Sequence, residues 1–470
     1  MKLKYNQTGL LLNVFIFAGF ISCTKLVQVP EPINTITNSE TFGSDATANS
    51  AIAGIYNDIL TGHGGSSYDL SFGNGLITID AAMSADEFHS INGNSPFEVN
   101  ALNSVNFPSS SFWNGPYFDI YLSNAAITGL QSSTGVSPPT RNQLTGEAKF
   151  LRAFCYFYLV NLFGDVPLVT TTAYSITDTL SRTPTEQVYK LIISDLHDAQ
   201  ALLPNDYSVS DGARIRVNQS GASALLSRVY LFEHQWDSAE ACANSIIANT
   251  SLYGLCSNLD SVFLANSFEA ILQWQVADIY PYATKEANTL IPTSSSARPN
   301  YYLTNSLLES FETGDQRRIN WVDSTKYSGK YYYFPYKYKV RVGSSGDNTE
   351  NYMVFRLAEQ YLIRAEARAQ QNTNLNGAIS DLNTLRERSG LSDLPDSLTQ
   401  AQVLTAVQQE RRIELFAEWG SRWLDLKRIG QAITILSNNK GFNVSANALL
   451  FPIPATELIN DANLIQNPGY

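Results

Sequence analysis

The sequence predicts a mainly α-helical fold, in which helix pairs form a scaffold that loop-rich segments interrupt. Two observations support this prediction. Apolar residues recur three and four positions apart over several long stretches, which is the spacing of one helix face. At 61–111 and 251–351 this spacing is lost, and Gly, Ser, Asn and Tyr are frequent. With 470 residues, 44% of them hydrophobic, the chain can bury one large core or two modest ones.

The first 22 residues have the pattern of a signal peptide. Two lysines precede an apolar run from Gly9 to Phe20, which is shorter than the about 20 residues that a membrane span needs. The run ends at Ser22 and Cys23, and a small residue before cysteine resembles the lipobox of bacterial lipoproteins. We therefore expect cleavage ahead of Cys23, a lipid on its sulfur, and a tether over 23–44. An ordinary signal peptide with a chance cysteine is the alternative.

The first half of the chain contains four expected helices: Asp45–Leu60, Trp113–Leu130, Gln143–Phe163 and Thr185–Leu203. The third is apolar over most of its circumference, so we expect it to be buried. Gly164 follows it, and glycine is the usual residue at a helix C-terminus.

Three helix pairs follow in the second half, and very few residues join the partners. The pairs are 219–235 with 236–249, 355–371 with 375–389, and 399–419 with 421–437. The pairing resembles tetratricopeptide units, although no fixed period repeats. Between the first two pairs one strand is legible at Phe334–Val340, where aromatic or apolar residues alternate with basic ones.

The composition argues against some classes of function. The formal net charge is -12, and an acidic protein is unsuited to bind nucleic acid. The four histidines and few cysteines match no metal, nucleotide or nucleophile motif, so we assign no catalytic residue, cofactor or metal ligand. Cys155 lies on an apolar helix face, whereas Cys242 and Cys256 are free either to pair or to stay reduced.

Five stretches together resemble the SusD/RagB family of lipid-anchored nutrient-binding proteins of Bacteroidota outer membranes. Its three signature helices are similar to LTGEAKFLRAFCYFYLVNLFGDVPLV at 144–169, FRLAEQYLIRAEARA at 355–369 and QQERRIELFAEWGSRWLDLKRIG at 408–430. Its second helix is similar to FWNGPYFDIYLSNAAI at 112–127, and its C-terminus to LFPIPATELINDANLIQNPGY at 450–470. The five stretches occur in the family's order and span nearly the whole chain.

The resemblance implies a fold and a role. The fold is one domain over 45–470, with tetratricopeptide-like helix pairs at 45–60, 112–250 and 352–437, and loop-rich ligand-binding segments with short strands at 61–111 and 251–351. The role is to bind oligosaccharides, or sometimes peptides, at the cell surface and to pass them to a SusC-like TonB-dependent transporter of the outer membrane. Members of the family have no known catalytic activity, so the resemblance implies a protein of polysaccharide utilisation that is not an enzyme.

Two further functions stay open at this point. A lipid-anchored glycoside hydrolase needs only two suitably placed carboxylates, and the chain has 43 acidic residues. A structural partner of the transporter with a vestigial pocket is the other. The charged stretch Glu410–Glu414, with Glu418, Arg422 and Asp425, is interpreted as ion pairs that orient helices, because such networks are far more often structural than catalytic.

The candidate site follows from the chemistry of sugars. A pyranose has an apolar face that stacks on a flat ring, and hydroxyls that pair with Asp, Asn or Arg, so the expected site has exposed aromatic residues beside polar ones on rigid loops. The regions 84–94 and 274–331 supply both. The candidate ligand-binding residues are Asp86, His89, Trp274, Tyr280, Tyr282, Arg298, Tyr301, Trp321 and Tyr331.

Overall fold

The computed structural model describes residues 38–62, 70–105, 107, 110–346 and 349–470. The expected signal peptide and the lipidated Cys23 lie outside these residues. The end of the expected tether belongs to the folded body, because helix α2 (Asn38–Thr41) leads to Phe42, which is part of the hydrophobic core. Within the described ranges, no helix is both long and apolar enough to cross a membrane.

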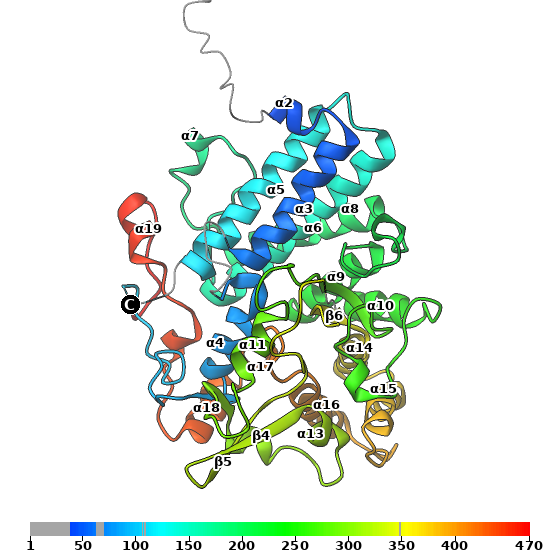
Figure 1. Ribbon diagram of the computed structural model, residues 1–470, viewed down its shortest axis with the longest axis vertical. Helices are drawn as coiled ribbons and strands as arrows, with labels where there is room; N and C mark the ends of the chain where they lie inside the picture. The colour runs from blue at the N-terminus through cyan, green and yellow to red at the C-terminus, as the bar shows by residue number, and fades with distance from the viewer. Residues whose placement is uncertain (1–37, 63–69, 106, 108–109, 347–348) are drawn as a thin grey trace, which may run out of the picture.

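The helices of the first half lie side by side in the upper part of Figure 1. They are α3 (Asp45–Thr61), α5 (Gly115–Ser132), α6 (Pro138–Phe163) and α8 (Thr185–Leu202). Helix α6 is the centre of this group and packs against the other three. Its apolar residues from Leu144 to Phe163 are buried, which confirms the expectation from its sequence. It ends at Gly164 in a positive-φ conformation, which glycine adopts without steric cost.

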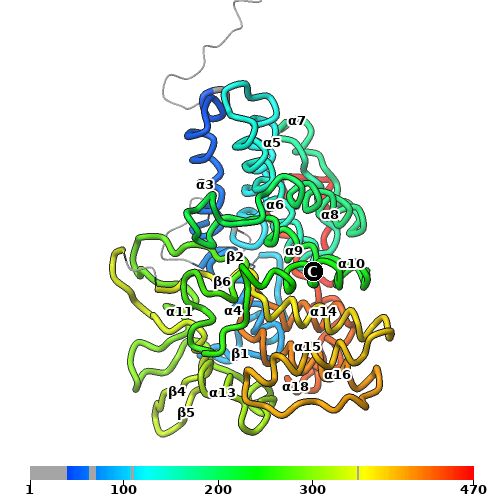
Figure 2. The backbone as a smooth tube through the Cα atoms, turned by 90° about the vertical axis from the view of Figure 1, so that its right-hand side faces the viewer, coloured from blue at the N-terminus to red at the C-terminus, as the bar shows by residue number. Residues whose placement is uncertain are grey.

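The helix pairs of the second half pack on one another although long segments separate them in sequence. They are α9 (Gln219–Phe232) with α10 (Trp236–Ile247), α14 (Leu357–Gln371) with α15 (Leu375–Arg388), and α16 (Gln400–Glu414), followed by α17 (Ser421–Arg428) and α18 (Ala432–Lys440). Helix α10 packs on α14, and α14 packs on α16, so the pairs form one scaffold (Figure 2). The mainly α-helical fold class is therefore confirmed.

Two of the expected helices are shorter than predicted. The helix expected over 399–419 stops at Glu414, because Ala417, Trp419 and Gly420 adopt positive φ. The helix expected over 421–437 is divided into α17 and α18 near Gly430, which also has positive φ. Positive φ is incompatible with a right-handed helix, and the apolar spacing alone does not reveal these breaks.

In the described part of the chain, three two-stranded antiparallel sheets lie among the loops. Strand β1 (Phe88–Ser90) pairs with β3 (Tyr301–Leu303), β2 (Ala270–Trp274) with β6 (Tyr352–Arg356), and β4 (Val322–Tyr327) with β5 (Lys330–Pro335). The strand expected at 334–340 is wrong beyond Pro335. Lys337 is 4% exposed, and its ammonium donates to the backbone carbonyl of Glu414 at 2.8 Å, so the alternating lysines do not mark a solvent face.

The segments expected to be loops contain further short helices. In 61–111 the π-helical turn Phe72–Leu76 leads into α4 (Ile77–Ser84), which is buried on every side and therefore shows no polar stripe in its sequence. A second π-helical turn spans Ser110–Asn114. In 251–351 the short helices are α11 (Lys285–Leu290), α12 (Asn305–Leu308), α13 (Gln316–Asn320) and the 3-10 turn Leu259–Ser261. Outside these segments lie α7 (Tyr174–Thr177), α19 (Ala455–Asn460) and the 3-10 turns Ser208–Ser210 and Ala446–Leu449.

Candidate functional site

A cavity of 620 Å³ is lined by residues of β1, β3, the β4–β5 hairpin and the end of α18. The hairpin and α18 are labelled in the lower part of Figures 1 and 2. The cavity draws its walls from four separate parts of the chain, at 85–99, 302–308, 330–333 and 439–442. The first three of these parts come from the segments that the sequence marks as loop-rich, and the last spans the end of the scaffold helix α18.

Strand pairing brings the first two walls together. In the β1–β3 register, Phe88 lies opposite Leu303 and His89 opposite Tyr302. Phe88 and Leu303 are buried in the core, and since neighbouring residues of a strand point to opposite faces, His89 and Tyr302 turn toward the cavity. Their ring centroids are 5.3 Å apart.

The β4–β5 hairpin adds three tyrosines, at 331, 332 and 333. Its turn consists of Ser328 and Gly329, both at positive φ, as in the tight turns that join two antiparallel strands. The Tyr332 ring meets the Tyr302 ring edge to face, with centroids 5.1 Å apart. Tyr331 is 56% exposed, which leaves its ring available to a ligand.

A carboxylate completes the upper wall. Glu98 accepts hydrogen bonds from the backbone N–H and the hydroxyl of Ser90, at 3.0 and 2.7 Å, and lies 2.7 Å from Nδ1 of His89. Burial alone would raise the pKa of Glu98, but the hydrogen bonds from His89 and Ser90 outweigh it and lower that pKa. The Glu98 carboxylate therefore holds the His89 imidazole in place at the cavity wall.

The floor is built around Asp86. Its carboxylate accepts hydrogen bonds from Arg422 (2.8 Å), Arg412 (2.9 Å) and the amide of Asn439 (2.6 Å). Burial would raise the pKa of Asp86, but Arg422 and Arg412 outweigh it and lower the pKa to about 2. Arg412 also donates to the hydroxyl of Ser306 at 2.8 Å, so the floor is joined to the wall that follows β3.

Lys440 ties the floor to the scaffold. Its ammonium donates to the carbonyls of Met83, Ser84 and Glu98 at 2.8, 3.0 and 2.9 Å, and to the side-chain oxygen of Asn100 at 2.6 Å. Burial lowers the pKa of Lys440 to about 7. The ammonium is directed at backbone oxygens, so Lys440 contributes rigidity to the cavity wall.

The structure brings together some of the predicted ligand-binding residues. Asp86, His89 and Tyr331 line the cavity. Arg298 lies over the rings of Tyr332 and Tyr302, which also line it. Tyr301 is the β3 partner of Ser90 and is next to the cavity wall without lining it.

The prediction needs correction for two tryptophans. Trp274 is 1% exposed, and its ring packs against Phe154 and Trp419, with centroids 5.0 and 5.2 Å apart. Trp321 is completely buried, and its indole N–H donates to the carbonyl of Leu259 at 3.1 Å. A ring enclosed in this way has no free face for a sugar, so both residues belong to the core.

Tyr280 and Tyr282 do not line the 620 Å³ cavity. Tyr280 is 49% exposed and lies with Tyr352 at a separate hollow of only 30 Å³. Tyr282 is half-buried at positive φ, and its backbone carbonyl is close to Gly343.

Sequence reasoning missed several cavity residues, chiefly Tyr302, Tyr332, Glu98, Lys440 and Phe442. Tyr302 and Tyr332 belong to aromatic runs that the sequence does show, but only the strand registers reveal which rings of those runs meet. Nothing local in the sequence marks Lys440, because its partners come from the segment at 83–100.

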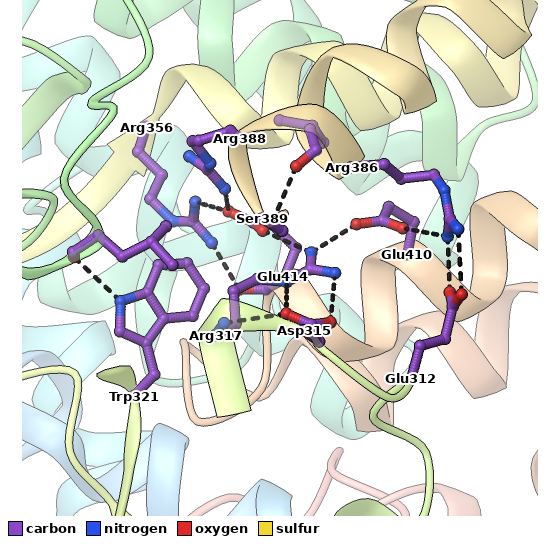
Figure 3. A network of polar contacts seen from close by, with 12 residues as sticks. Glu312, Asp315, Arg317, Trp321, Arg356, Arg386, Arg388, Ser389, Glu410 and Glu414 are labelled. Carbon is purple, nitrogen blue, oxygen red and sulfur yellow. Dashed lines mark hydrogen bonds and ion pairs between the residues drawn. The ribbon is translucent and has the colours of Figure 1, made fainter. Parts of the chain in front are cut away.

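The charged stretch of α16 forms a buried network with other elements (Figure 3). Glu414 is fully buried and accepts hydrogen bonds from Arg317 (2.9 Å), Arg356 (2.5 Å) and Arg388 (2.5 Å), and we call these four residues the Glu414 cluster. Its members come from α13, β6, α15 and α16, so the network fixes elements far apart in sequence. The structural interpretation of this stretch is consistent with that geometry. Arg411 pairs with Asp425 of the next helix, α17, at 2.8 Å, whereas Glu414 takes its partners from more distant elements.

Two other features complete the description of the molecule. A hollow of 660 Å³ lies between α5, α7 and α19, with Tyr117, Tyr121 and Tyr174 on its walls, and includes none of the predicted site residues. Cys155, Cys242 and Cys256 are all free thiols, so Cys242 and Cys256 do not pair.

Two family models match the chain. Residues 279–470 match one described as the SusD family, and residues 33–231 match one described as starch-binding and associating with the outer membrane. The SusD-like protein P2 of Formosa agariphila is 27% identical over 99% of this chain and 100% of its own length. The starch-binding protein SusD of Bacteroides thetaiotaomicron is 32% identical, but over only 25% of this chain and 21% of its own.

Solved structures agree with these matches. A SusD superfamily protein from Parabacteroides distasonis superposes with a TM-score of 0.77 at 24% identity, over 90% of this chain and 99% of its own. A laminarin-binding SusD-like protein superposes with a TM-score of 0.74 at 25% identity, over 91% of this chain and 100% of its own. With two family models that together cover most of its length, this chain belongs to the SusD/RagB family.

Proposed function

We propose that this protein binds carbohydrate at the outer membrane, with the 620 Å³ cavity as its binding site. The observation that carries the proposal is the composition of the walls, where an exposed tyrosine ring and the Tyr302–Tyr332 pair stand beside short polar side chains. Rings of this kind stack on the apolar face of a sugar, and hydroxyls and amides bind its edges. The matches to a starch-binding family model and to a laminarin-binding structure support the same proposal.

The electrostatics favour binding over hydrolysis. A glycoside hydrolase requires one carboxyl group that stays protonated to act as the general acid, and so has a raised pKa. The two carboxylates that line the cavity, Asp86 and Glu98, both have lowered pKa values. Each is also occupied by protein partners, which suits a structural role at a binding site.

We also propose a membrane anchor and a transporter partner for this protein, on the basis of its N-terminal sequence and its family. Lipid attachment at Cys23 would hold the protein at the outer membrane, where it would deliver its ligand to a SusC-like TonB-dependent transporter. Mass spectrometry of the mature protein tests the first part, because a lipid on an N-terminal Cys23 is expected and an unmodified N-terminus at another residue contradicts it. Co-purification of the transporter with the membrane-anchored protein tests the second.

The binding proposal is tested by titrating the purified protein with a panel of oligosaccharides in a calorimeter, with product analysis alongside. Saturable binding without cleavage is expected for at least one saccharide. Tyr331→Ala should weaken that binding, whereas the control Tyr327→Ala should not, because Tyr327 is an exposed tyrosine of the same hairpin that does not line the cavity. Equal losses in both variants, or binding of peptides alone, would contradict the proposal.

A further inference from the structure

Three cations lie on the rings of tyrosines that line the cavity, and one of them, Lys330, lines the cavity itself. The Arg298 guanidinium lies over Tyr332 and Tyr302, at 5.0 and 5.7 Å from the ring centroids. The Lys330 ammonium is 5.2 Å from the Tyr332 centroid. On the opposite face of the hairpin, the Lys326 ammonium is 5.3 Å from the centroid of Tyr331. We call Arg298, Lys326 and Lys330 the rim cations.

The rim cations have no acidic partners within the described part of the chain. The buried arginines of the Glu414 cluster are bound to a carboxylate, because Arg317, Arg356 and Arg388 all pair with Glu414. Arg298, in contrast, makes no hydrogen bond to any described residue, and its buried Nε is without a partner. Only the faces of tyrosine rings stabilise these cations, and such contacts are worth about 0.5–1 kcal/mol at exposed sites.

The acids near the cavity do not neutralise this charge. Asp86 is bound to Arg412 and Arg422, and Glu98 to His89 and Ser90. Asp323 is on the hairpin itself, but it lies opposite Phe334, at the end away from the turn and the rim cations. The rim is therefore locally basic on a protein whose formal net charge is -12.

We propose that the ligand is an anionic oligosaccharide, whose carboxylate or sulfate groups bind the rim cations while its sugar faces stack on Tyr331 and Tyr302. This inference rests on the proposed function and narrows its ligand class. Guanidinium and ammonium groups form charge-assisted hydrogen bonds with such anions, which are stronger than those with hydroxyls. A site for neutral sugar needs the rings and amides, but gains nothing from cations without carboxylate partners that lie on those rings.

The test compares ligands that differ only in charge. Oligogalacturonate is titrated beside its methyl ester, and a sulfated galactan oligosaccharide beside its desulfated form, in low and high salt. We expect at least one charged member to bind tenfold or more tightly than its neutral counterpart, and high salt to reduce this advantage. The carboxylated and sulfated arms show which anion the site prefers.

Substitutions of the rim cations test whether these residues cause the preference for charged ligands. Lys330→Gln and Arg298→Gln should each remove most of the preference for the charged ligand, so that the ratio of charged to neutral affinity falls toward one. The control is Lys190→Gln, because Lys190 is an exposed lysine on α8 with a carboxylate partner of its own, Glu186. It should change neither affinity.

The outcomes separate this inference from the proposed function. Neutral and charged members that bind equally well, or a preference that survives both rim variants, would overturn the anionic ligand while carbohydrate binding stands. If no saccharide of either kind binds, both proposals fail. A charge preference that is lost only in the rim variants supports both.

Discussion

The Glu414 cluster and the rim cations show two uses of arginine and lysine within one molecule. In the cluster, three guanidiniums surround one fully buried carboxylate, and every member comes from a different element of the fold. At the rim, the cations lie on tyrosine rings without a carboxylate partner among the described residues. The comparison teaches that charge paired inside the scaffold fixes its geometry, whereas charge left unpaired at a cavity is available to a ligand.

The strongest test of this comparison is Glu414→Gln. The variant leaves three guanidiniums buried without their shared anion, and breaking a buried ion pair in this way costs about 3–5 kcal/mol. Denaturant unfolding should show a loss of that order. Glu387→Gln on α15 is the control, since Glu387 is exposed, and its free energy of unfolding should change by less than ~0.5 kcal/mol. If Glu414→Gln lowered the free energy of unfolding as little as Glu387→Gln does, the Glu414 cluster would not stabilise the scaffold more than exposed charges do.

Trp274→Ala tests the corrected position of that ring. Its contacts with Phe154 and Trp419 are lost, and a cavity opens in the core, so the free energy of unfolding should fall by about 3 kcal/mol. The affinity of the folded protein for sugar should stay unchanged. Trp236→Ala, at the half-buried start of α10, should cost less. A stable Trp274→Ala protein that has lost sugar binding would restore the original assignment.

Two nearby carboxyl groups extend the comparison to pH. Burial raises the pKa of Asp80 to about 8, whereas Arg422 and Arg412 lower that of Asp86 to about 2 despite its burial. Between pH 4 and 8 the unfolded chain has released the Asp80 proton and the folded chain retains it, so this group lowers stability by roughly 1.4 kcal/mol per pH unit as the pH rises. Asp86 has the opposite effect on the free energy of unfolding. Its ionised form stabilises the folded state above about pH 4, and this stabilisation is lost as the pH falls from about 4 toward 2.

The measurement is the free energy of unfolding against pH for the wild type and Asp80→Asn. The amide does not ionise, so the variant should gain stability over the wild type as the pH rises from 5 to 8. Identical pH profiles for the two proteins would show that Asp80 titrates normally in the folded state.

The smallest effect on stability is expected for Tyr331→Ala at the rim. The ring is 56% exposed, so the free energy of unfolding should change by no more than ~0.5 kcal/mol. Sugar affinity should nevertheless fall about tenfold, which is ~1.4 kcal/mol of binding free energy. Thermal melts and calorimetric titrations of the same preparation measure both quantities. A large fall in melting temperature would place Tyr331 with the scaffold.

Periodicity predicted the scaffold well and the site only in part. Helix α6 was predictable because its apolar spacing extends over many turns, and burial on all sides follows directly from it. The alternation after Phe334 suggested a strand, but Lys337 is drawn inward by Glu414 and Glu418, partners that lie far along the chain. Local pattern contains no information about such distant partners.

The same limit explains the tryptophans. In a segment without helical spacing, an aromatic residue fits a core and a ligand platform equally well, and only the packing of Phe154 and Trp419 around Trp274 decides between them. His89 and Tyr331 could be proposed because each stands beside polar residues in a loop-rich segment. The contact between His89 and Tyr302, however, depends on the pairing of β1 with β3, which the sequence does not specify.

The β1–β3 ladder has a consequence for how the protein matures. It joins residues 88–90 to residues 301–303, and Lys440 closes the same wall from near the C-terminus. Contacts of such long sequence separation form late, after the local helices. A chain that still lacks residues 439–442 also lacks part of the cavity wall, so we expect the cavity to close only once nearly all of the polypeptide is available to fold.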